Sequence, residues 1–196
     1  MDEPRRTPRQ RRSRETVATL VEAAAQVFSR EGMNATSNRI AARAGLSIGT
    51  LYQYFPDKTA LLRAVAARHV RDADRRLSEV FDRLRDDAPP FDVAMRMLVE
   101  AVVDLHRDRP RLHAVLHRMV PQGADEMAEL QAFEDRICDE VAFHLKRCDR
   151  GGDDPELTAR TLVHTLDAQL HRVQTRHGFD AAALTRVVNQ LAPPPG

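Results

Sequence analysis

The chain has 196 residues, 42% hydrophobic and 30% charged, enough for one good core or for a small domain joined to a larger one. No apolar run approaches the roughly 18 to 20 residues of a membrane span, and no apolar segment follows the basic start. We therefore predict a cytoplasmic protein with no membrane partner.

Charge is unevenly distributed along the chain, although the net charge is only +1. Residues 1–58 hold ten Lys/Arg against six Asp/Glu, and six of these arginines fall within the first fourteen positions. We expect residues 1–12 to form a basic, disordered arm. Such an arm suits a polyanion, but solvated tails have the same composition.

Apolar residues recur at spacings of three and four, and neither period-two alternation nor a hairpin signal occurs, so the fold is predicted to be all-α. The first helix should begin near Ser13 as its N-cap and end at Gly32. A short second helix should lie between Thr36 as N-cap and Gly45.

The third helix, "IGTLYQYF", should be capped by Ser47 and ended by Pro56. A fourth, over about 58–85, is long enough to leave one domain and enter the next. Beyond "DDAPP", Pro and Gly punctuation predicts further helices over 91–107, 110–119, 124–148, 154–177 and 180–191. The expected domains are 13–62 and 63–192, followed by a disordered tail at 193–196.

A helix, a glycine turn and a second helix form the helix-turn-helix unit, whose second helix presents side chains to the DNA major groove. In the third helix only Leu51 and Phe55 are spaced to pack inward, which leaves most other positions free to touch a partner. An isolated Tyr-x-Tyr would more often be a pair of half-buried rings. Here the surrounding order of residues is specific.

The stretch "TSNRIAARAGLSIGTLYQYFPDKTALL" resembles the DNA-binding head of the TetR (tetracycline-repressor-like) family, over roughly residues 13–62. The resemblance implies a three-helix head, a connecting long helix and a C-terminal helical body for ligand binding and dimerisation. It departs from the family at Met33, where many members have an aromatic residue, and we expect methionine to fill that space. The expected DNA contacts are Thr36, Ser37, Asn38, Ser47, Ile48, Gly49, Thr50, Tyr52, Tyr54 and Lys58.

A head of this size reads only a few base pairs, so a double-stranded operator should be bound by a homodimer. The resemblance places the dimer interface in the last two long helices, where two apolar stripes occur: Leu162, Leu166, Leu170, Val173, Leu184, Val187, Val188 and Leu191. It also implies a cavity in the body for an unidentified small-molecule effector. Candidate walls, each of which is also an ordinary core residue, are Phe81, Leu84, Met95, Leu98, Val102, Leu112, Leu116, Met119, Phe133 and Ile137.

All eight histidines lie outside the head. His113 and His117 are spaced i, i+4, and His164, Asp167 and His171 share one helix face, as in some zinc sites. Such spacing is common by chance and no HExxH or paired-cysteine set accompanies it, so we predict no metal and no cofactor. The histidines are expected on helix surfaces or at the dimer interface, with a ligand-contacting role as the alternative.

The leading hypothesis is a dimeric, ligand-released transcriptional repressor. An enzyme is disfavoured because no nucleophile elbow, phosphate loop or dinucleotide fingerprint is present in the sequence. The remaining alternative is a helical protein-binding adaptor that retains the head without specific DNA binding.

Overall fold

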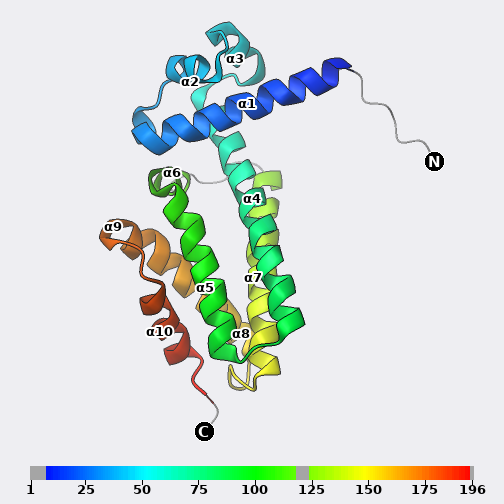
Figure 1. Cartoon of the computed structure of the whole chain (residues 1–196), viewed down its shortest axis with the longest axis vertical. Coiled ribbons are helices and arrows are strands. Elements are labelled where there is room, and N and C mark those ends of the chain that lie inside the picture. The colour runs from blue at the N-terminus through cyan, green and yellow to red at the C-terminus, as the bar shows by residue number, and fades with distance from the viewer. Residues whose placement is uncertain (1–7, 118–123, 195–196) are drawn as a thin grey trace, which may run out of the picture. The chain divides into compact units, whose positions relative to one another are not determined.

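The computed structural model describes residues 8–117 and 124–194, and every regular element within these ranges is helical, as predicted (Figure 1). The chain divides into two compact units, Met1–Arg68 and His69–Gly196. Within the described ranges, no helix combines the length and the apolar character needed to cross a bilayer.

The first unit is a small helical domain with its own core. Its elements are α1 (Pro8–Glu31), a 3-10 turn (Gly32–Asn34), α2 (Ser37–Ala44), α3 (Ile48–Tyr54) and the start of α4 (Lys58–Asp87). Helix α2 packs against both α1 and α3. The core consists mainly of fully buried apolar side chains, among them Leu20, Ala24, Phe28, Ile40, Leu51, Leu61 and Val65.

Helix α1 begins at Pro8, five residues before the predicted start, so the prediction of Ser13 as N-cap is wrong. Proline is favoured at the first position of a helix, and the arginines and glutamine that follow are good helix formers. An ion pair between Arg11 and Glu15, 3.5 Å apart, adds support at i, i+4. The segment expected to be disordered is therefore helical from Pro8 onward; residues 1–7 lie outside the described ranges.

Hydrogen-bonded caps start the short helices where they were predicted. The Thr36 hydroxyl accepts from the Arg39 N–H at 3.4 Å, and the Ser47 hydroxyl accepts from the Thr50 N–H at 3.0 Å. The Asp57 carboxylate likewise accepts from the Ala60 N–H at 2.7 Å at the start of α4. Gly45 ends α2 with a left-handed φ of 68°, which a side chain would strain. These local contacts set the turn between α2 and α3.

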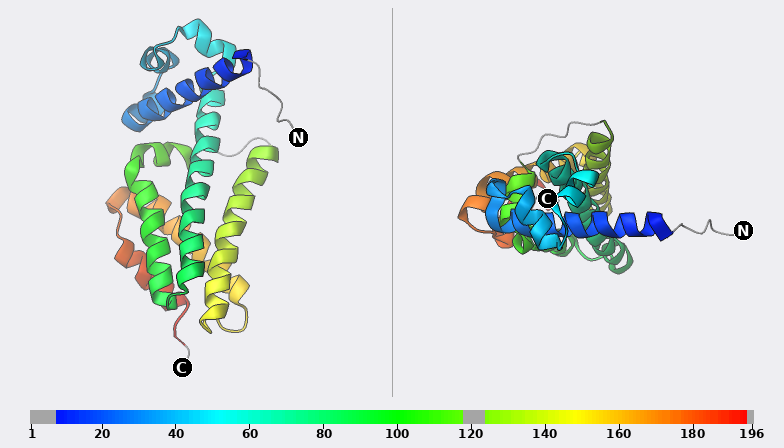
Figure 2. Two further views of the ribbon diagram at one scale, coloured as in Figure 1. Left: turned by 45° about the vertical axis from the view of Figure 1, so that its right-hand side comes forward. Right: turned by 90° about the horizontal axis from the view of Figure 1, so that it is seen from above.

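The second unit is a bundle in which α7 packs along α8 and α10 packs along α5 (Figures 1 and 2). Its helices after α4 are α5 (Phe91–Asp108), α6 (Pro110–Leu116), α7 (Ala124–Arg147), α8 (Pro155–Ala168), α9 (Thr175–His177) and α10 (Ala181–Leu191). A π-helical segment, Gln169–Gln174, connects α8 to α9.

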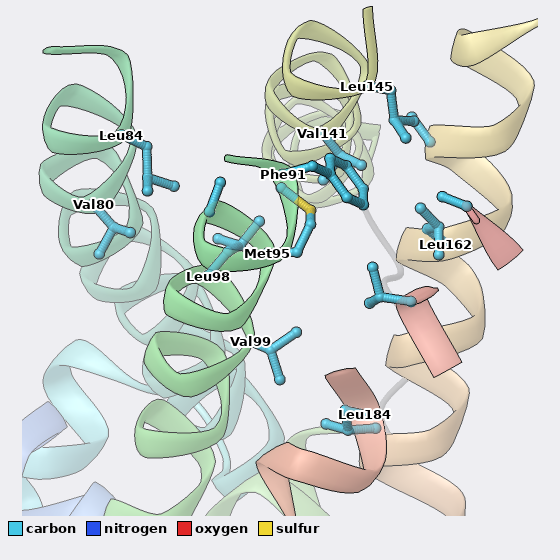
Figure 3. Packing of buried hydrophobic residues seen from close by; sticks show 14 of the residues in the cluster. Val80, Leu84, Phe91, Met95, Leu98, Val99, Val141, Leu145, Leu162 and Leu184 are labelled. Carbon is cyan, nitrogen blue, oxygen red and sulfur yellow. The ribbon is translucent and has the colours of Figure 1, made fainter. Parts of the chain in front are cut away.

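One continuous apolar core holds this bundle together (Figure 3). Leu84 of α4, Leu145 of α7, Leu162 of α8 and Leu184 of α10 are each at most 2% exposed. Burying a leucine side chain stabilises the folded state by about 1.5–3 kcal/mol. Met95 of α5 is also 2% exposed, so the core draws on every long helix of the unit.

The segment predicted as a single helix over 154–177 has a different structure. Helix α8 ends at Ala168 and the backbone widens into the π turn. The Gln174 side chain is buried there and hydrogen-bonds both the carbonyl and the N–H of Asp180, at 3.1 and 3.0 Å. These hydrogen bonds between residues six positions apart hold the turn, and helical periodicity carries no signal for them.

Candidate nucleic-acid interface

Helix α3 is anchored on one side and open on the other. Leu51 is fully buried and Phe55 is 8% exposed, so both pack inward as predicted. At about 100° of rotation per residue, Gly49 and Gln53 lie within roughly 20° of the direction opposite Leu51. Both are exposed. The helix thus presents an outward face that the core of the unit does not use.

The ten residues predicted to contact DNA all lie in α2, α3, their caps and the first residue of α4. The exposed ones are Thr36, Asn38, Ser47, Ile48, Gly49 and Tyr52, and the half-buried ones are Ser37, Thr50, Tyr54 and Lys58. Tyr52, with 51% of its surface exposed, is a large ring without a core role. Because none of the ten is buried, all remain predicted DNA contacts.

Ser47, Thr50 and Lys58 of this set make hydrogen bonds within the domain. The Ser47 hydroxyl accepts from the Thr50 N–H at 3.0 Å and hydrogen-bonds the Thr50 hydroxyl at 2.9 Å. The Lys58 ammonium donates to the carbonyls of Met33 and Ala35, at 3.0 and 3.3 Å. Lys58 therefore ties α4 to the loop before α2, a structural role that the sequence did not indicate.

Met33 does not fill the space of an aromatic residue, contrary to expectation. It is 54% exposed, whereas Ala35 is 1% exposed and occupies the core beside the loop. The 3-10 turn directs Met33 outward.

Sequence reasoning left Gln53 out of the expected contacts. Its amide is exposed on the outward face of α3, and a glutamine in the major groove can hydrogen-bond both N6 and N7 of adenine. Its place relative to Leu51 on a helical wheel was the signal that could have identified it. Arg43 of α2 is a second exposed candidate; its guanidinium donates to the side-chain amide oxygen of Gln26 at 2.7 Å.

The two stripes predicted as a dimer interface are only partly available to a second subunit. Leu162, Leu170, Leu184 and Val188 are at most 3% exposed and belong to the core of their own chain. The helices close over one another more completely than expected. Leu166 and Val187 are half-buried, Val173 and Leu191 are each 42% exposed, and these four stay predicted interface residues.

The residues predicted to line the pocket also fall into buried and half-buried groups. Phe81, Leu84, Met95 and Leu98 are buried in the main core, whereas Val102, Phe133 and Ile137 are half-buried and pack against it. Leu112 is buried in α6 and Leu116 is half-buried; Met119 lies outside the described residues. The effector cavity therefore stays a prediction, and the half-buried residues Val102, Leu116, Phe133 and Ile137 are its best candidates.

The body histidines depart most from expectation. His69, His106, His113, His117 and His171 come together from four parts of the second unit, with neighbouring ring centroids between 3.9 and 4.7 Å apart. Burial lowers the pKa of His106 to about 4 and that of His113 to about 2, so both rings are neutral at pH 7. The assignment of the histidines to helix surfaces is wrong for His106, His113 and His144, which are 9%, 4% and 0% exposed.

A capped helix, a left-handed glycine turn and a short helix with an open polar face define a helix-turn-helix DNA-binding domain. Residues 20–65 match the family described as "Bacterial regulatory proteins, tetR family", and residues 90–192 match "Tetracyclin repressor-like, C-terminal domain". The chain belongs to the TetR family and is a transcriptional regulator with a helix-turn-helix DNA-binding domain. This class consists of regulators and not of enzymes.

Curated relatives match over part of their length. The HTH-type transcriptional repressor LfrR of Mycolicibacterium smegmatis is 34% identical over 93 residues, which is 47% of this chain and 47% of LfrR. An uncharacterised HTH-type regulator of Mycobacterium tuberculosis, Rv1255c, is 33% identical over 121 residues, 60% of this chain and 57% of its own. The chain thus spans about half the length of the curated relatives it matches.

Solved structures share the fold over nearly the whole chain. A TetR-like regulator from Rhodococcus sp. RHA1 has a TM-score of 0.64 at 24% identity, covering 90% of this chain and 92% of its own. The multidrug binding protein EbrR, complexed with imidazole, has a TM-score of 0.66 at 19% identity, covering 92% and 96%. Since these identities are low, the likeness concerns the fold.

Proposed function

We propose that the protein is a dimeric repressor that binds a palindromic DNA operator in the cytoplasm and leaves it when a small molecule binds the body. The observation that carries the DNA-binding part is the outward face of α3, where Gly49, Gln53 and Tyr52 are exposed while Leu51 anchors the helix. In a helix buried in a protein core, side chains at these positions would pack against neighbouring elements.

Dimerisation follows from the size of the head. A single three-helix domain reaches only a few base pairs, so useful affinity requires two heads on an inverted repeat. Exposed apolar side chains along α8 and the segments after it offer a surface for the second copy: Leu157 at 54%, Val173 at 42% and Leu191 at 42%. The interface predicted from the sequence did not include Leu157, and we add this residue to the proposed dimer surface.

Similar proteins support the proposals that this protein represses transcription and that a ligand releases it from DNA. LfrR is named a repressor, and EbrR is named a multidrug binding protein. The half-buried apolar residues Val102, Phe133 and Ile137 would suit a moderately hydrophobic effector.

Selection of duplex DNA from a random pool by the purified protein, at near-physiological salt, tests the proposal. We expect enrichment of an inverted repeat and a complex of two chains per duplex. Affinity should fall steeply as salt rises, because phosphate contacts release counterions. Folded, dimeric protein that enriches no sequence would overturn the proposal and favour the adaptor function. Release of the selected duplex by a screened compound then tests the effector.

A further inference from the structure

Four side chains of the second unit bring metal-ligand atoms to one place. His106 lies in α5, His117 directly follows α6, Asp167 lies in the last turn of α8, and His171 lies in the π turn. One donor atom each of His117, Asp167 and His171 lies within 4.8 Å of the other two. Asp167 and His171 are four residues apart, while His106 and His117 reach them through the tertiary fold.

The Nε2 atom of His171 is the junction of the group. It lies 3.3 Å from Asp167 Oδ1 and 3.3 Å from His106 Nε2. A tetrahedral ion with metal–nitrogen distances of about 2.0–2.1 Å holds its donor atoms about 3.3–3.4 Å apart. The two separations around His171 are therefore already those of a coordination shell.

His106 is oriented as metal-bound histidines usually are. Its Nδ1 lies 2.7 Å from the carbonyl oxygen of Val102, which can only accept a hydrogen bond. Nδ1 must then carry the proton, and the neutral ring directs the lone pair of Nε2 toward His171. A ligating histidine that donates its other N–H to a backbone carbonyl is the common second-shell arrangement of metal sites.

His117 lies over His171 with parallel rings, 3.9 Å between centroids and 6° between planes. Its side chain is exposed, so a rotation about its own bonds can redirect a nitrogen toward the junction at small cost. The Nδ1 atom of His171 is buried and has no hydrogen-bond partner within the described ranges. A buried ring nitrogen without a partner is unusual, so hydrogen bonds within the described residues do not account for the whole His171 ring.

We propose that His117, Asp167 and His171, with His106 beside them, bind one divalent transition-metal ion of the zinc type. Three neutral imidazoles and one carboxylate suit Zn²⁺, Co²⁺ or Ni²⁺, whereas Ca²⁺ and Mg²⁺ prefer all-oxygen shells. The site lies within the second unit and goes beyond the proposed function, since ion binding does not depend on whether the head binds DNA.

The π turn gives the site a structural setting. Such turns are rare and are often found at functional positions in helices. Here the turn places His171 at 87% side-chain burial while Asp167, one helical turn earlier, stays 52% exposed. An ion held between them would link α5, α6, α8 and the π turn.

The test uses tag-free, full-length protein that has been treated with a chelator. Zn²⁺ is titrated in by calorimetry, and Co²⁺ is titrated as a probe whose visible absorption reports tetrahedral coordination. We expect one ion per chain. His117→Asn and Asp167→Asn should each weaken binding at least ~10-fold, because each removes a ligand.

His164→Asn is the matched control, since His164 is exposed on α8 three residues before Asp167 and lies outside the group. It should bind the ions as the unmodified chain does. Thermal unfolding without metal checks that each variant is folded; His117 is exposed, so His117→Asn keeps the test available if another variant misfolds. Absence of saturable binding by the unmodified chain, or an equal loss in His164→Asn, would overturn the proposal.

Discussion

The outward face of α3 and the histidine group of the body are built in opposite ways. The first consists of exposed side chains from seven consecutive residues, oriented by one cap and by Leu51. The second is collected from segments far apart in the chain, from His69 of α4 to His171 of the π turn, and its central rings are buried. Residues on an exposed face can be changed with little effect on folding. A substitution in the buried group is expected to change stability together with any function of the group.

The largest expected effect comes from truncating Leu51, the buried side chain that anchors α3. Leu51→Ala should lower the free energy of unfolding of the first unit by about 2–5 kcal/mol, because it removes a fully buried side chain and leaves a cavity. Urea denaturation followed by circular dichroism measures this. Tyr52→Ala on the exposed side should change stability by less than about 0.5 kcal/mol; similar losses in both variants would contradict the two-sided description of α3.

The second prediction concerns pH and the buried histidines. Burial, with His106 of α5, His69 of α4 and His171 of the π turn nearby, holds the pKa of His113 at about 2. An unfolded histidine has a pKa near 6.5, so below that pH only the unfolded state takes up the proton. Stability is therefore fully present above about pH 6.5 and is lost as pH falls, by up to ~1.4 kcal/mol per pH unit.

His113→Gln isolates that contribution. The glutamine amide can still donate to the carbonyl of Leu105, which His113 Nε2 contacts at 2.9 Å, but it does not titrate. Unfolding free energies measured between pH 7.5 and 4.5 should decline less steeply in this variant. An unchanged slope would show that His113 is protonated in the folded protein or contributes nothing to the acid response.

The third prediction tests base recognition by the exposed face. Gln53→Ala should weaken binding to the selected operator by about 1–3 kcal/mol while leaving binding to random duplex DNA nearly unchanged. Fluorescence anisotropy with both duplexes measures the difference. Gln131→Ala, at an exposed position of α7, is the control for loss of a surface amide. Equal weakening on both duplexes would exclude base readout by Gln53.

Gly49→Ala should have a small effect on stability whose sign is opposite to that of Leu51→Ala. A Cβ at this position would meet only Ser47 Oγ, at 3.7 Å, so the fold accepts it. Alanine should stabilise α3 by about 0.5–1 kcal/mol, because glycine costs conformational entropy in a helix. If DNA approaches this face closely, the same methyl group should weaken operator binding. A variant that is more stable and binds equally well would move the DNA contact away from Gly49.

Much of the head was predictable because its contacts are local. The caps at Thr36, Ser47 and Asp57 bond to residues three positions further on, and the turn at Gly45 needs only a residue that tolerates positive φ. The start of α1 was misplaced because a serine is a good cap but not an obligatory one, and the helix-forming residues before it continue the helix. The fixing of Lys58 by two carbonyls depends on a loop 23 to 25 residues away and carries no local signal.

In the body, the sequence by itself determined the approximate bounds of the long helices, apart from the segment 154–177, and the identity of the apolar stripes, because helical periodicity is a property of neighbouring residues. Only the tertiary structure decided which stripes are buried within one chain, such as those that contain Leu162 and Leu184. It also decided which histidines come into contact. The two histidine spacings visible in the sequence were each divided: His117 and His171 came together, whereas His113 packed beside His106. Contacts between helices depend on how whole faces pack, and the spacing of residues along the chain does not reveal that pairing.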